Sequence, residues 1–381
     1  MGNSITLILF LSEYRGQPES EYSTDRDFTV RGAQTNEAPV SYTIQRLAKK
    51  GEKLSRIIAL VTPKAKASAL ERFKEVVSAK SPETTIAEVE IPDNVTVTEL
   101  LRRTLEALLP TKPSDSVVIE STGGYRRAVN AITLLTRFLR YSKVGVLFST
   151  YSDLAVKHVG DTRETDELSA LLDAVNVFAV TGNAREIKKL FGQWKLDEKT
   201  AFFRAADKFY NSLLVCRAPS IESNILELRD AIESLKNAEY GTEEPKLLIF
   251  RELVLTIVEQ KMTFLYSESI LLDFIKWCSD NWYLQQAVTF LRESLVGANP
   301  KSSSGSYILT KEDYHVLRVL RNSINHASGK AEYDKSDPCV TEKIVEKVNK
   351  LLENTNEIKG FVESLLKKYE LSSDSTARVA R

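Results

Sequence analysis

Short runs of apolar residues alternate with amphipathic segments through roughly the first 150 residues of the chain. The runs predict buried strands over residues 5–11, 56–63, 84–92, 115–121 and 143–150. The spacing of apolar residues between them predicts helices over residues 39–51, 68–79, 97–109 and 126–141. Continuous apolar strands that alternate with helices are typical of a mostly parallel sheet covered on both faces. We therefore predict an α/β, Rossmann-like doubly wound domain over residues 1–158.

A polar stretch after the first strand predicts a small hairpin that turns at Thr24–Asp27. From Asp161 onwards the pattern is helical only, with long amphipathic segments such as 222–238 and 245–262. We see no internal repeat in either part of the sequence. The sequence therefore predicts that an all-α region over residues 159–381 follows the α/β domain.

The composition is that of an ordinary soluble globular protein, with 43% hydrophobic and 27% charged residues. At 381 residues the chain is longer than one hydrophobic core usually supports, so we expect two domains. Lys and Arg together number 52, as do Asp and Glu, so no overall field attracts nucleic acid. Contact with RNA or phosphate must therefore come from a local cluster of residues.

The three cysteines, Cys216, Cys278 and Cys339, lie far apart and form no CxxC pair. This pattern indicates reduced thiols without a zinc site or a disulfide framework. No basic residue precedes the apolar run at 5–11 and no small-residue cleavage site follows it, so we interpret it as a buried strand. No segment approaches the roughly 20 apolar residues that a membrane span needs. We expect a cytoplasmic protein with no membrane partner.

Residues 115–132, DSVVIESTGGYRRAVNAI, predict a strand, a turn with two glycines and a helix. Glycines let a ligand approach the backbone closely, and a helix N-terminus offers unpaired N–H groups. Arg126 and Arg127 add positive charge at the carboxyl end of a strand, where open α/β sheets bind ligands. For this turn alone, a tight strand-to-helix connection without a ligand is an equally open interpretation.

The absence of two short motifs argues against two classes of nucleotide-binding site. The first strand is followed by LSEYRGQPES rather than GxGxxG, which argues against a nicotinamide or flavin cofactor. The chain contains no GxxxxGK[ST], so it is not a P-loop ATPase. A phosphate-bearing ligand without a redox or hydrolytic cofactor fits the turn better.

The segment TKEDYHVLRVLRNSINHA (310–327) has Thr310 and Asp313 at capping-box spacing, so a helix is expected to begin near Lys311. At about 100° per residue, one side of this helix carries Val316, Leu317, Leu320, Ile324 and Ala327. The other side carries His315, Arg318, Asn322, Asn325 and His326, with Arg321 at its border. Two of the three histidines therefore share one polar stripe with arginine and asparagine.

This set of side chains suits cleavage of RNA without a metal ion. Imidazole transfers protons near neutral pH, and arginine binds phosphate through forked hydrogen bonds. RNA carries its own nucleophile, the 2′-hydroxyl, so the enzyme needs only to orient it, transfer protons and neutralise charge. No carboxylate or thiol cluster has metal-ligand spacing and no HExxH occurs, so we expect no metal. A solvated helix face without a function is the alternative for this spacing alone.

Arg321 and His326 lie about 140° apart on an ideal helix, so one helix cannot easily direct both at one phosphate. A two-fold dimer brings two copies of the motif together. The sequence therefore predicts a composite site formed by two subunits.

The two motifs together resemble the CARF–HEPN ribonucleases of type III CRISPR systems. R-N-x-x-x-H in a C-terminal helical region, carried by Arg321, Asn322 and His326, resembles the HEPN ribonuclease motif. The turn ESTGGYR resembles the D-I-T-G-G-x-R turn of CARF domains, although Glu120 and Ser121 depart from the usual Asp and Ile. The order of the domains and the total length also match, so the resemblance covers essentially the whole chain.

The resemblance implies a homodimer in antiviral defence, with a CARF sensor domain over residues 1–158 and a HEPN domain within 159–381. The sensor would bind a cyclic oligoadenylate, and the HEPN domain would then cut single-stranded RNA without a cofactor or metal. The implied catalytic residues are Arg321, Asn322 and His326, with Asn325 as a helper. The expected ligand contacts, from the turn and from strand-end positions, are Ser12, Ser121, Thr122, Gly123, Gly124, Arg126 and Ser149.

Two other functions stay open at this point. A CARF-type, ligand-responsive transcription regulator would need a basic recognition helix, and we find no separate helix-turn-helix. A non-catalytic helical interaction module would carry the R-N-x-x-x-H motif as a surface accident. An assay for ribonuclease activity separates these alternatives.

Overall fold

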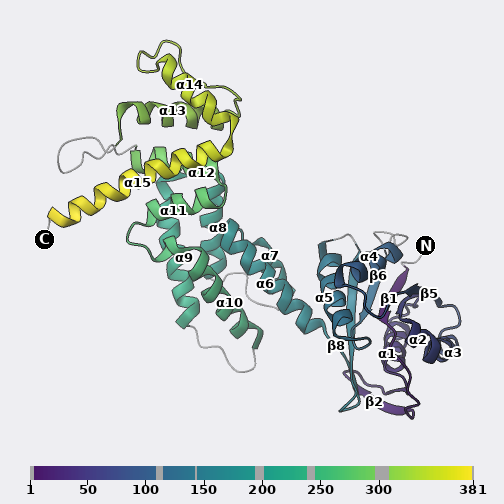
Figure 1. The fold of residues 1–381 in the computed structure, drawn as a ribbon. Helices are drawn as coiled ribbons and strands as arrows, with labels where there is room; N and C mark the ends of the chain where they lie inside the picture. The colour runs from purple at the N-terminus through teal and green to yellow at the C-terminus, as the bar shows by residue number, and fades with distance from the viewer. Residues whose placement is uncertain are drawn as a thin grey trace. The chain divides into compact units, whose positions relative to one another are not determined.

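The computed structural model describes residues 4–108, 115–141, 144–193, 201–237, 245–296 and 309–379 (Figure 1). These residues belong to two compact units, Met1–Glu167 and Leu168–Arg381. The first unit is built on a sheet and the second consists of helices, as the change of pattern along the sequence predicts. The chain therefore combines an N-terminal α/β unit with a helical C-terminal region.

An eight-stranded sheet forms the first unit, with its strands in the order β3-β2-β8-β7-β6-β1-β4-β5. The strands are β1 (Ile5–Phe10), β2 (Ser20–Thr24), β3 (Val30–Gly32), β4 (Arg56–Val61), β5 (Thr85–Glu90), β6 (Ser116–Glu120), β7 (Gly145–Asp153) and β8 (His158–Asp161). β1 is buried along its whole length, as expected of a central strand covered on both faces. Each of the apolar runs that predicts a strand forms one.

The pairing of the strands is mostly parallel, as predicted. β1 pairs in parallel with both β4 and β6, so that Ile8 lies beside Ile58 and Ile119. The pairs β4–β5, β6–β7 and β2–β8 are also parallel, whereas β7–β8 and β2–β3 are antiparallel. The strand order therefore reverses between β1 and β6, which is the arrangement of a Rossmann-like doubly wound sheet.

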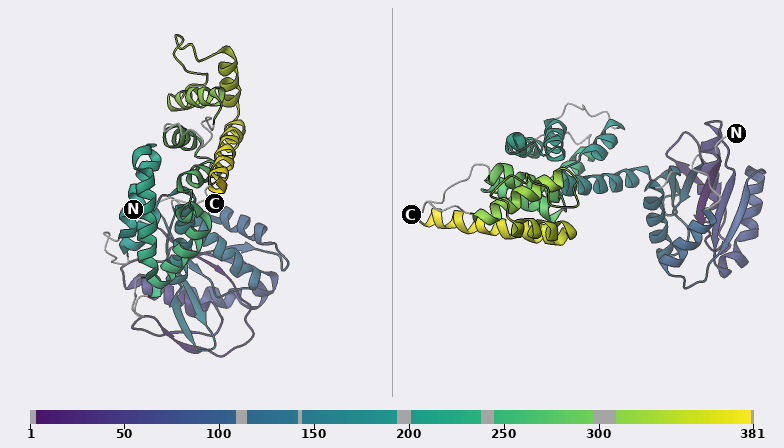
Figure 2. Two further views of the ribbon diagram at one scale, coloured as in Figure 1. Left: turned by 90° about the vertical axis from the view of Figure 1, so that its left-hand side faces the viewer. Right: turned by 90° about the horizontal axis from the view of Figure 1, so that it is seen from above.

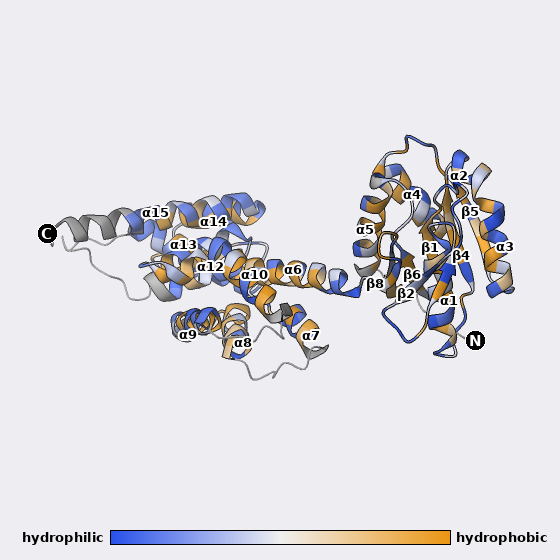
Figure 3. Cartoon of the chain, turned by 90° about the horizontal axis from the view of Figure 1, so that it is seen from below, coloured by the Kyte–Doolittle hydropathy of each residue, from blue (hydrophilic) through white to orange (hydrophobic). Residues whose placement is uncertain are grey.

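Helices cover both faces of this sheet (Figure 2). They are α1 (Glu37–Ala48), α2 (Pro63–Ser68), α3 (Leu70–Lys80), α4 (Val97–Leu108) and α5 (Arg126–Tyr141). Tyr42 and Phe73 belong to the core under α1 and α3, which contains Leu7 of β1. Leu135 belongs to the core under α4 and α5, which contains Ile8. Because successive strand residues face opposite sides, the apolar residues of the strands fill both cores. The strands of the sheet are accordingly coloured as hydrophobic in Figure 3.

Short strands extend the sheet beyond β7. β2 and β3 form the hairpin that the sequence predicts around Thr24–Asp27. The sequence pattern does not predict β8, which begins at His158 and ends at Asp161, beyond the expected end of the first domain. The strand is held from the side by α1, where Arg46 Nη2 lies 2.8 Å from Asp161 Oδ2 with both side chains buried. Residues up to Asp161 therefore belong to the α/β unit.

The C-terminal region contains helices throughout its described residues. The helical elements that follow β8 are α6 (Arg163–Thr181), α7 (Arg185–Gln193), α8 (Ala201–Leu214), α9 (Ala218–Asn237), α10 (Pro245–Lys261), η1 (Thr263–Tyr266), α11 (Ile270–Asp280), α12 (Leu284–Phe290), η2 (Leu291–Val296), α13 (Lys311–Asn325), α14 (Glu342–Glu353) and α15 (Thr355–Val379). Aromatic rings fill the centre of this core, where the ring centroids of Phe264 and Phe274 lie 5.3 Å apart. α13 packs against both α12 and α14.

Candidate functional site

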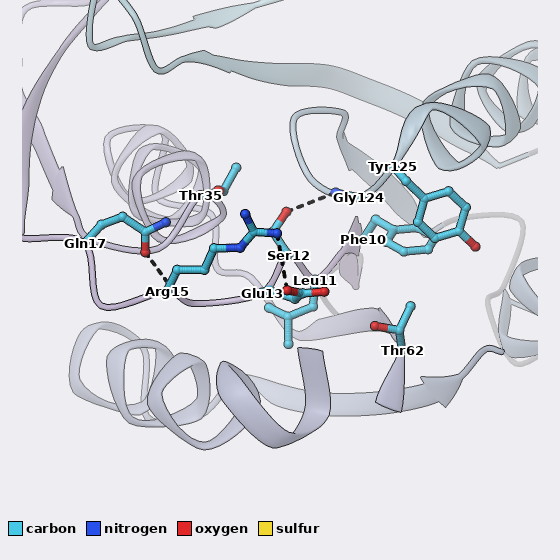
Figure 4. A pocket seen from close by; sticks show the side chains of 10 residues that line it. All are labelled: Phe10, Leu11, Ser12, Glu13, Arg15, Gln17, Thr35, Thr62, Gly124 and Tyr125. Carbon is cyan, nitrogen blue, oxygen red and sulfur yellow. Dashed lines mark hydrogen bonds and ion pairs between the residues drawn. The ribbon is translucent and has the colours of Figure 1, made fainter. Parts of the chain in front are cut away.

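The carboxyl ends of β1 and β6 lie side by side, because these strands pair in parallel where the strand order reverses. A pocket of about 350 Å³ opens at this point (Figure 4). It is lined by Phe10, Leu11, Ser12, Glu13, Arg15, Gln17, Thr35, Thr62, Gly124 and Tyr125. The pocket therefore lies where open α/β sheets bind ligands.

Ser12 and the glycine turn meet at this pocket, as their positions after adjacent strands predict. The N–H of Gly124 donates to Ser12 Oγ at 3.0 Å. The N–H of Ser12 donates to Asn36 Oδ1 at 2.9 Å, so the loop after β1 is fixed from both sides. Gly124 is exposed and has a φ of +90°, a conformation that favours glycine.

Further residues that are not among the predicted ligand contacts also line the pocket. Arg15 and Gln17 lie on one side of it, and Tyr125 and Phe10 lie on the other (Figure 4). The side chain of Arg15 is 77% exposed, and its Nη2 lies 3.4 Å from Glu13 Oε2. The rings of Phe10 and Tyr125 meet edge to face, with centroids 5.3 Å apart. The pocket thus offers a cation, amide and hydroxyl groups, and an aromatic wall.

Three other predicted ligand contacts have hydrogen-bond partners within the protein, and two of them, Ser121 and Thr122, tie the glycine turn to β7. Ser121 Oγ donates to the carbonyl oxygen of Thr150 at 3.0 Å. Thr122 Oγ1 accepts from the N–H of Ser152 at 2.7 Å. Ser149 is buried and its Oγ donates to Asp166 Oδ2 at 3.0 Å. The lining residues of the described pocket do not include these three. Ser149 does not stand at a strand end, because β7 continues past it.

Gly123 is buried and packs against β1. A Cβ added there would lie 2.0 Å from the carbonyl oxygen of Phe10 and 2.4 Å from Asn36 Nδ2. The packing of the turn against β1 therefore requires a glycine at position 123, a reason that the sequence does not indicate. Arg126 is the first residue of α5, and its side chain lies outside the described residues.

Glu120 connects the turn to the rest of the pocket wall. Its side chain is fully buried and accepts from the N–H of Thr122 at 2.7 Å and from Asn36 Nδ2 at 2.5 Å. Burial raises the pKa of the Glu120 carboxyl, and the hydrogen bonds from Thr122 and Asn36 oppose this rise. Asn36 Nδ2 also donates to the carbonyl oxygen of Phe10 at 2.9 Å. These bonds join the loops after β1 and β6 into one frame.

Replacing Gly123 with alanine is expected to destabilise the α/β unit, because its Cβ would collide with the backbone of β1. Overpacking of this kind costs about 1–3 kcal/mol or more. Gly145→Ala is the matched control, since a Cβ there meets no atom within 4 Å. Thermal unfolding by circular dichroism, with hydrogen exchange of β1 and β6, compares the two variants. Equal stability of both variants would contradict the role given to Gly123.

The second candidate site lies at the end of α13. The helix begins as predicted, with Thr310 Oγ1 accepting from the N–H of Asp313 at 3.1 Å. Val316, Leu317 and Leu320 are buried, as the apolar stripe predicts. The helix ends at Asn325, and Ala327, expected on the apolar side, is exposed beyond it with a φ of +52°. His326 therefore stands at the helix end and not within the helix.

Arg321 is held against a carboxylate from η2. Its Nη2 lies 3.3 Å from Glu293 Oε1, and its Nη1 donates to Asn322 Oδ1 at 3.2 Å. Its Nε is buried and has no hydrogen-bond partner among the described residues. About a third of the side chain, 32%, is exposed. Arg321 and Asn322 are thus brought together, and part of the guanidinium faces solvent.

His326 and Asn325 have partners of their own. Nδ1 of His326 lies 3.4 Å from Glu332 Oε1, and the side chain is 62% exposed. Asn325 Oδ1 accepts from Gln285 Nε2 and Thr289 Oγ1 of α12, both at 3.4 Å. Arg321 and His326 are therefore held by different carboxylates. The spacing of residues along α13 does not identify Glu293 or Glu332 as partners, because both glutamates lie outside this helix.

His315, the other histidine of this helix, is set apart from the motif. Its Nδ1 is buried without a hydrogen-bond partner among the described residues, and its ring lies edge to face with Tyr314. Burial, followed by the nearby Arg318 guanidinium, lowers the pKa of His315. A histidine in this setting contributes packing.

The described part of the chain contains no group of three or more His, Cys, Asp or Glu side chains placed to hold a metal ion. In the same residues, no helix is both long enough and apolar enough to cross a membrane.

No protein-family model matches this chain, and no curated protein matches it. Among solved structures, the chain is similar to Enterococcus italicus Csm6 bound to cyclic hexa-2′-fluoro-hexa-dAMP. The identity is 10%, the match covers 96% of this chain and 94% of that chain, and the TM-score is 0.35.

Proposed function

We propose that this chain is a cyclic oligoadenylate-activated endoribonuclease of the type III CRISPR CARF–HEPN family, which cuts single-stranded RNA without a metal ion. The observation that carries the proposal is the end of α13. There Arg321, Asn322 and the exposed His326 supply a phosphate-binding cation, an amide and a proton-transfer group.

The reaction that suits these groups is attack of the RNA 2′-hydroxyl on the adjacent phosphorus. As the new bond forms, the bond from phosphorus to the 5′-oxygen breaks, which leaves a 2′,3′-cyclic phosphate and a 5′-hydroxyl. His326 accepts the proton of the 2′-hydroxyl and returns it to the leaving 5′-oxygen, and Arg321 stabilises the charge that develops on the phosphate oxygens. Asn322 and Asn325 orient these groups, since an amide positions without adding charge.

We propose a homodimer whose ribonuclease site contains residues of both subunits. Arg321 and His326 are bound to different carboxylates, from η2 and from the segment after α13. Their positions differ by about 140° around an ideal helix. A two-fold axis that places the two motifs face to face lets the arginine of one subunit and the imidazole of the other act on one phosphate.

The sensor, expected over residues 1–158, is assigned to the whole α/β unit, which also contains β8 up to Asp161. The ribonuclease is assigned to a HEPN domain within the helices that follow, in a cytoplasmic protein. The pocket at the ends of β1 and β6 has features that suit a cyclic oligoadenylate. Arg15 and the backbone at Gly124 fit phosphate, and Tyr125 offers a ring to a base. Ser12 fixes the glycine turn against the loop that carries Arg15.

The test is cleavage of single-stranded RNA by the purified chain in excess EDTA, with and without cyclic tetra- or hexa-adenylate. We expect activation by one of these ligands and products that end in a 2′,3′-cyclic phosphate. Strict dependence on a divalent metal would contradict the mechanism. Salt-sensitive binding of duplex DNA without RNA cleavage would favour a transcription regulator, and the absence of both activities would favour an interaction module.

A further inference from the structure

The imidazole of His326 has a carboxylate partner that the sequence motif does not contain. Glu332 Oε1 lies 3.4 Å from Nδ1 of His326, with 47% of the Glu332 side chain exposed. Glu332 belongs to the segment that joins α13 to α14 (Figure 1). An exposed pair of this kind contributes little to stability. The pair can therefore affect function mainly by orienting the imidazole of His326.

The backbone around Glu332 is fixed by hydrogen bonds to both flanking helices. Its own N–H donates to Ser323 Oγ of α13 at 2.8 Å. The N–H of the preceding Ala331 donates to Asn349 Oδ1 of α14 at 2.7 Å. Ser323 is fully buried and lies in the motif itself, between Arg321 and the histidine. The position of the carboxylate is thus set by the same helix end that carries the imidazole.

The turn after His326 brings the segment back toward the helix. Ala327 has a φ of +52°, which reverses the chain directly after the histidine. The N–H of Ser328 then donates to the carbonyl oxygen of Ser323 at 2.8 Å, and the N–H of Ala327 donates to that of Ile324 at 3.0 Å. These bonds form the pattern that closes many helix C-termini. Ser323 therefore accepts two hydrogen bonds from the segment after α13, one at its carbonyl oxygen from Ser328 and one at its hydroxyl from Glu332.

We propose that Glu332 is a positioning residue for His326, and this proposal rests on the proposed ribonuclease function. In this role the Glu332 carboxylate, 3.4 Å from Nδ1, would accept the Nδ1–H and leave Nε2 to face the RNA. An imidazole has two ring nitrogens, and the hydrogen bond that one of them makes determines which of the two carries the proton. A carboxylate orients a catalytic imidazole in this way in Ser-His-Asp enzymes. Glu332 itself does not contact the RNA.

Nuclear magnetic resonance of the full chain with ¹⁵N-labelled histidine tests this without any ribonuclease activity. The chain has only three histidines, so replacing each in turn assigns the ring signals. In the neutral ring we expect His326 to carry its proton on Nδ1 in the wild type. In Glu332→Ala the proton should move to Nε2, the form that a free imidazole prefers. An Nε2 proton in the wild type, or the same tautomer in both proteins, would overturn the proposal.

Kinetics of RNA cleavage provide the second half of the test. Glu332→Ala should lower kcat roughly 10–100-fold, the usual effect of losing such an orienting partner, and leave KM unchanged. Glu332→Gln should fall between the two, because its amide oxygen still accepts the Nδ1–H. The matched control is Glu346→Ala, an exposed glutamate of α14, which should behave as wild type. An unchanged kcat, or a rise in KM alone, would overturn the proposal. If the wild type cuts no RNA, the proposed function fails, and the tautomer still decides the role of Glu332.

Discussion

Replacing His326 with alanine is expected to lower the cleavage of single-stranded RNA by roughly 10²–10⁴-fold, the contribution of a positioned acid–base group. The side chain is 62% exposed and follows the last residue of α13, so its removal leaves no cavity in the core. The buried residues that hold the helix, such as Leu317 and Leu320, are untouched. The variant should therefore fold normally and bind the activator as the wild type does.

A fluorogenic RNA assay at saturating cyclic oligoadenylate measures this loss, with isothermal titration as the check on activator binding. His315→Ala is the control on the same helix, since His315 packs against Tyr314 apart from the motif. It should keep most of the ribonuclease activity. Full activity in His326→Ala, or an equal loss in both variants, would show that the His326 imidazole does not transfer the proton.

The strands of the α/β unit were predictable because both faces of the sheet are covered. A strand such as β1 is buried at every position, so it appears in the sequence as an unbroken apolar run, ITLILF. β8 has no such signal. Its four residues, HVGD, are held by pairing with β7 and by the buried Arg46–Asp161 ion pair. These are tertiary contacts, which a local pattern does not contain.

The place of the pocket was predictable, but the roles of its residues were not. Topology brings the ends of β1 and β6 together, which places Ser12 beside Gly124. The packing of Gly123 on the carbonyl oxygen of Phe10 has no signal in the sequence, because it depends on a contact between two loops. The sequence also does not indicate which residues of the polar loop after β1 line the pocket. Arg15 does so because of the conformation of that loop.

In α13, too, the local features were predictable from the sequence and the tertiary contacts were not. The capping residue Thr310 and the apolar stripe are local features, and the structure contains both. The partners of Arg321 and His326 come from outside the helix, Glu293 from η2 and Glu332 from the segment after α13. Spacing within one helix therefore identifies the residues of the motif but not the groups that orient them.

The sensor should be weakened by a change at Arg15, and the expected result is a Kd for the cyclic oligoadenylate that is roughly 10–100-fold higher in Arg15→Ala. A hydrogen bond to a charged group contributes about 1.5–3 kcal/mol, and each 1.4 kcal/mol corresponds to about a tenfold change in Kd. The guanidinium is 77% exposed and its pairing with Glu13 is weak, so it is free to bind phosphate. The loop is closed by other bonds, such as that from Tyr14 Oη to the carbonyl oxygen of Gln17 at 3.1 Å. The variant should therefore keep its fold.

Arg31→Ala is the matched control for this change. Arg31 is also exposed, at 66%, and is paired with Glu21 at 3.3 Å, but it is not among the residues that line the pocket. Isothermal titration gives the Kd of each variant, and the activator concentration for half-maximal RNA cleavage should rise by the same factor, because activation is linked to binding. An unchanged Kd in Arg15→Ala would place the sensor site elsewhere. An equal rise in both variants would mean that bulk charge, rather than this pocket, attracts the activator.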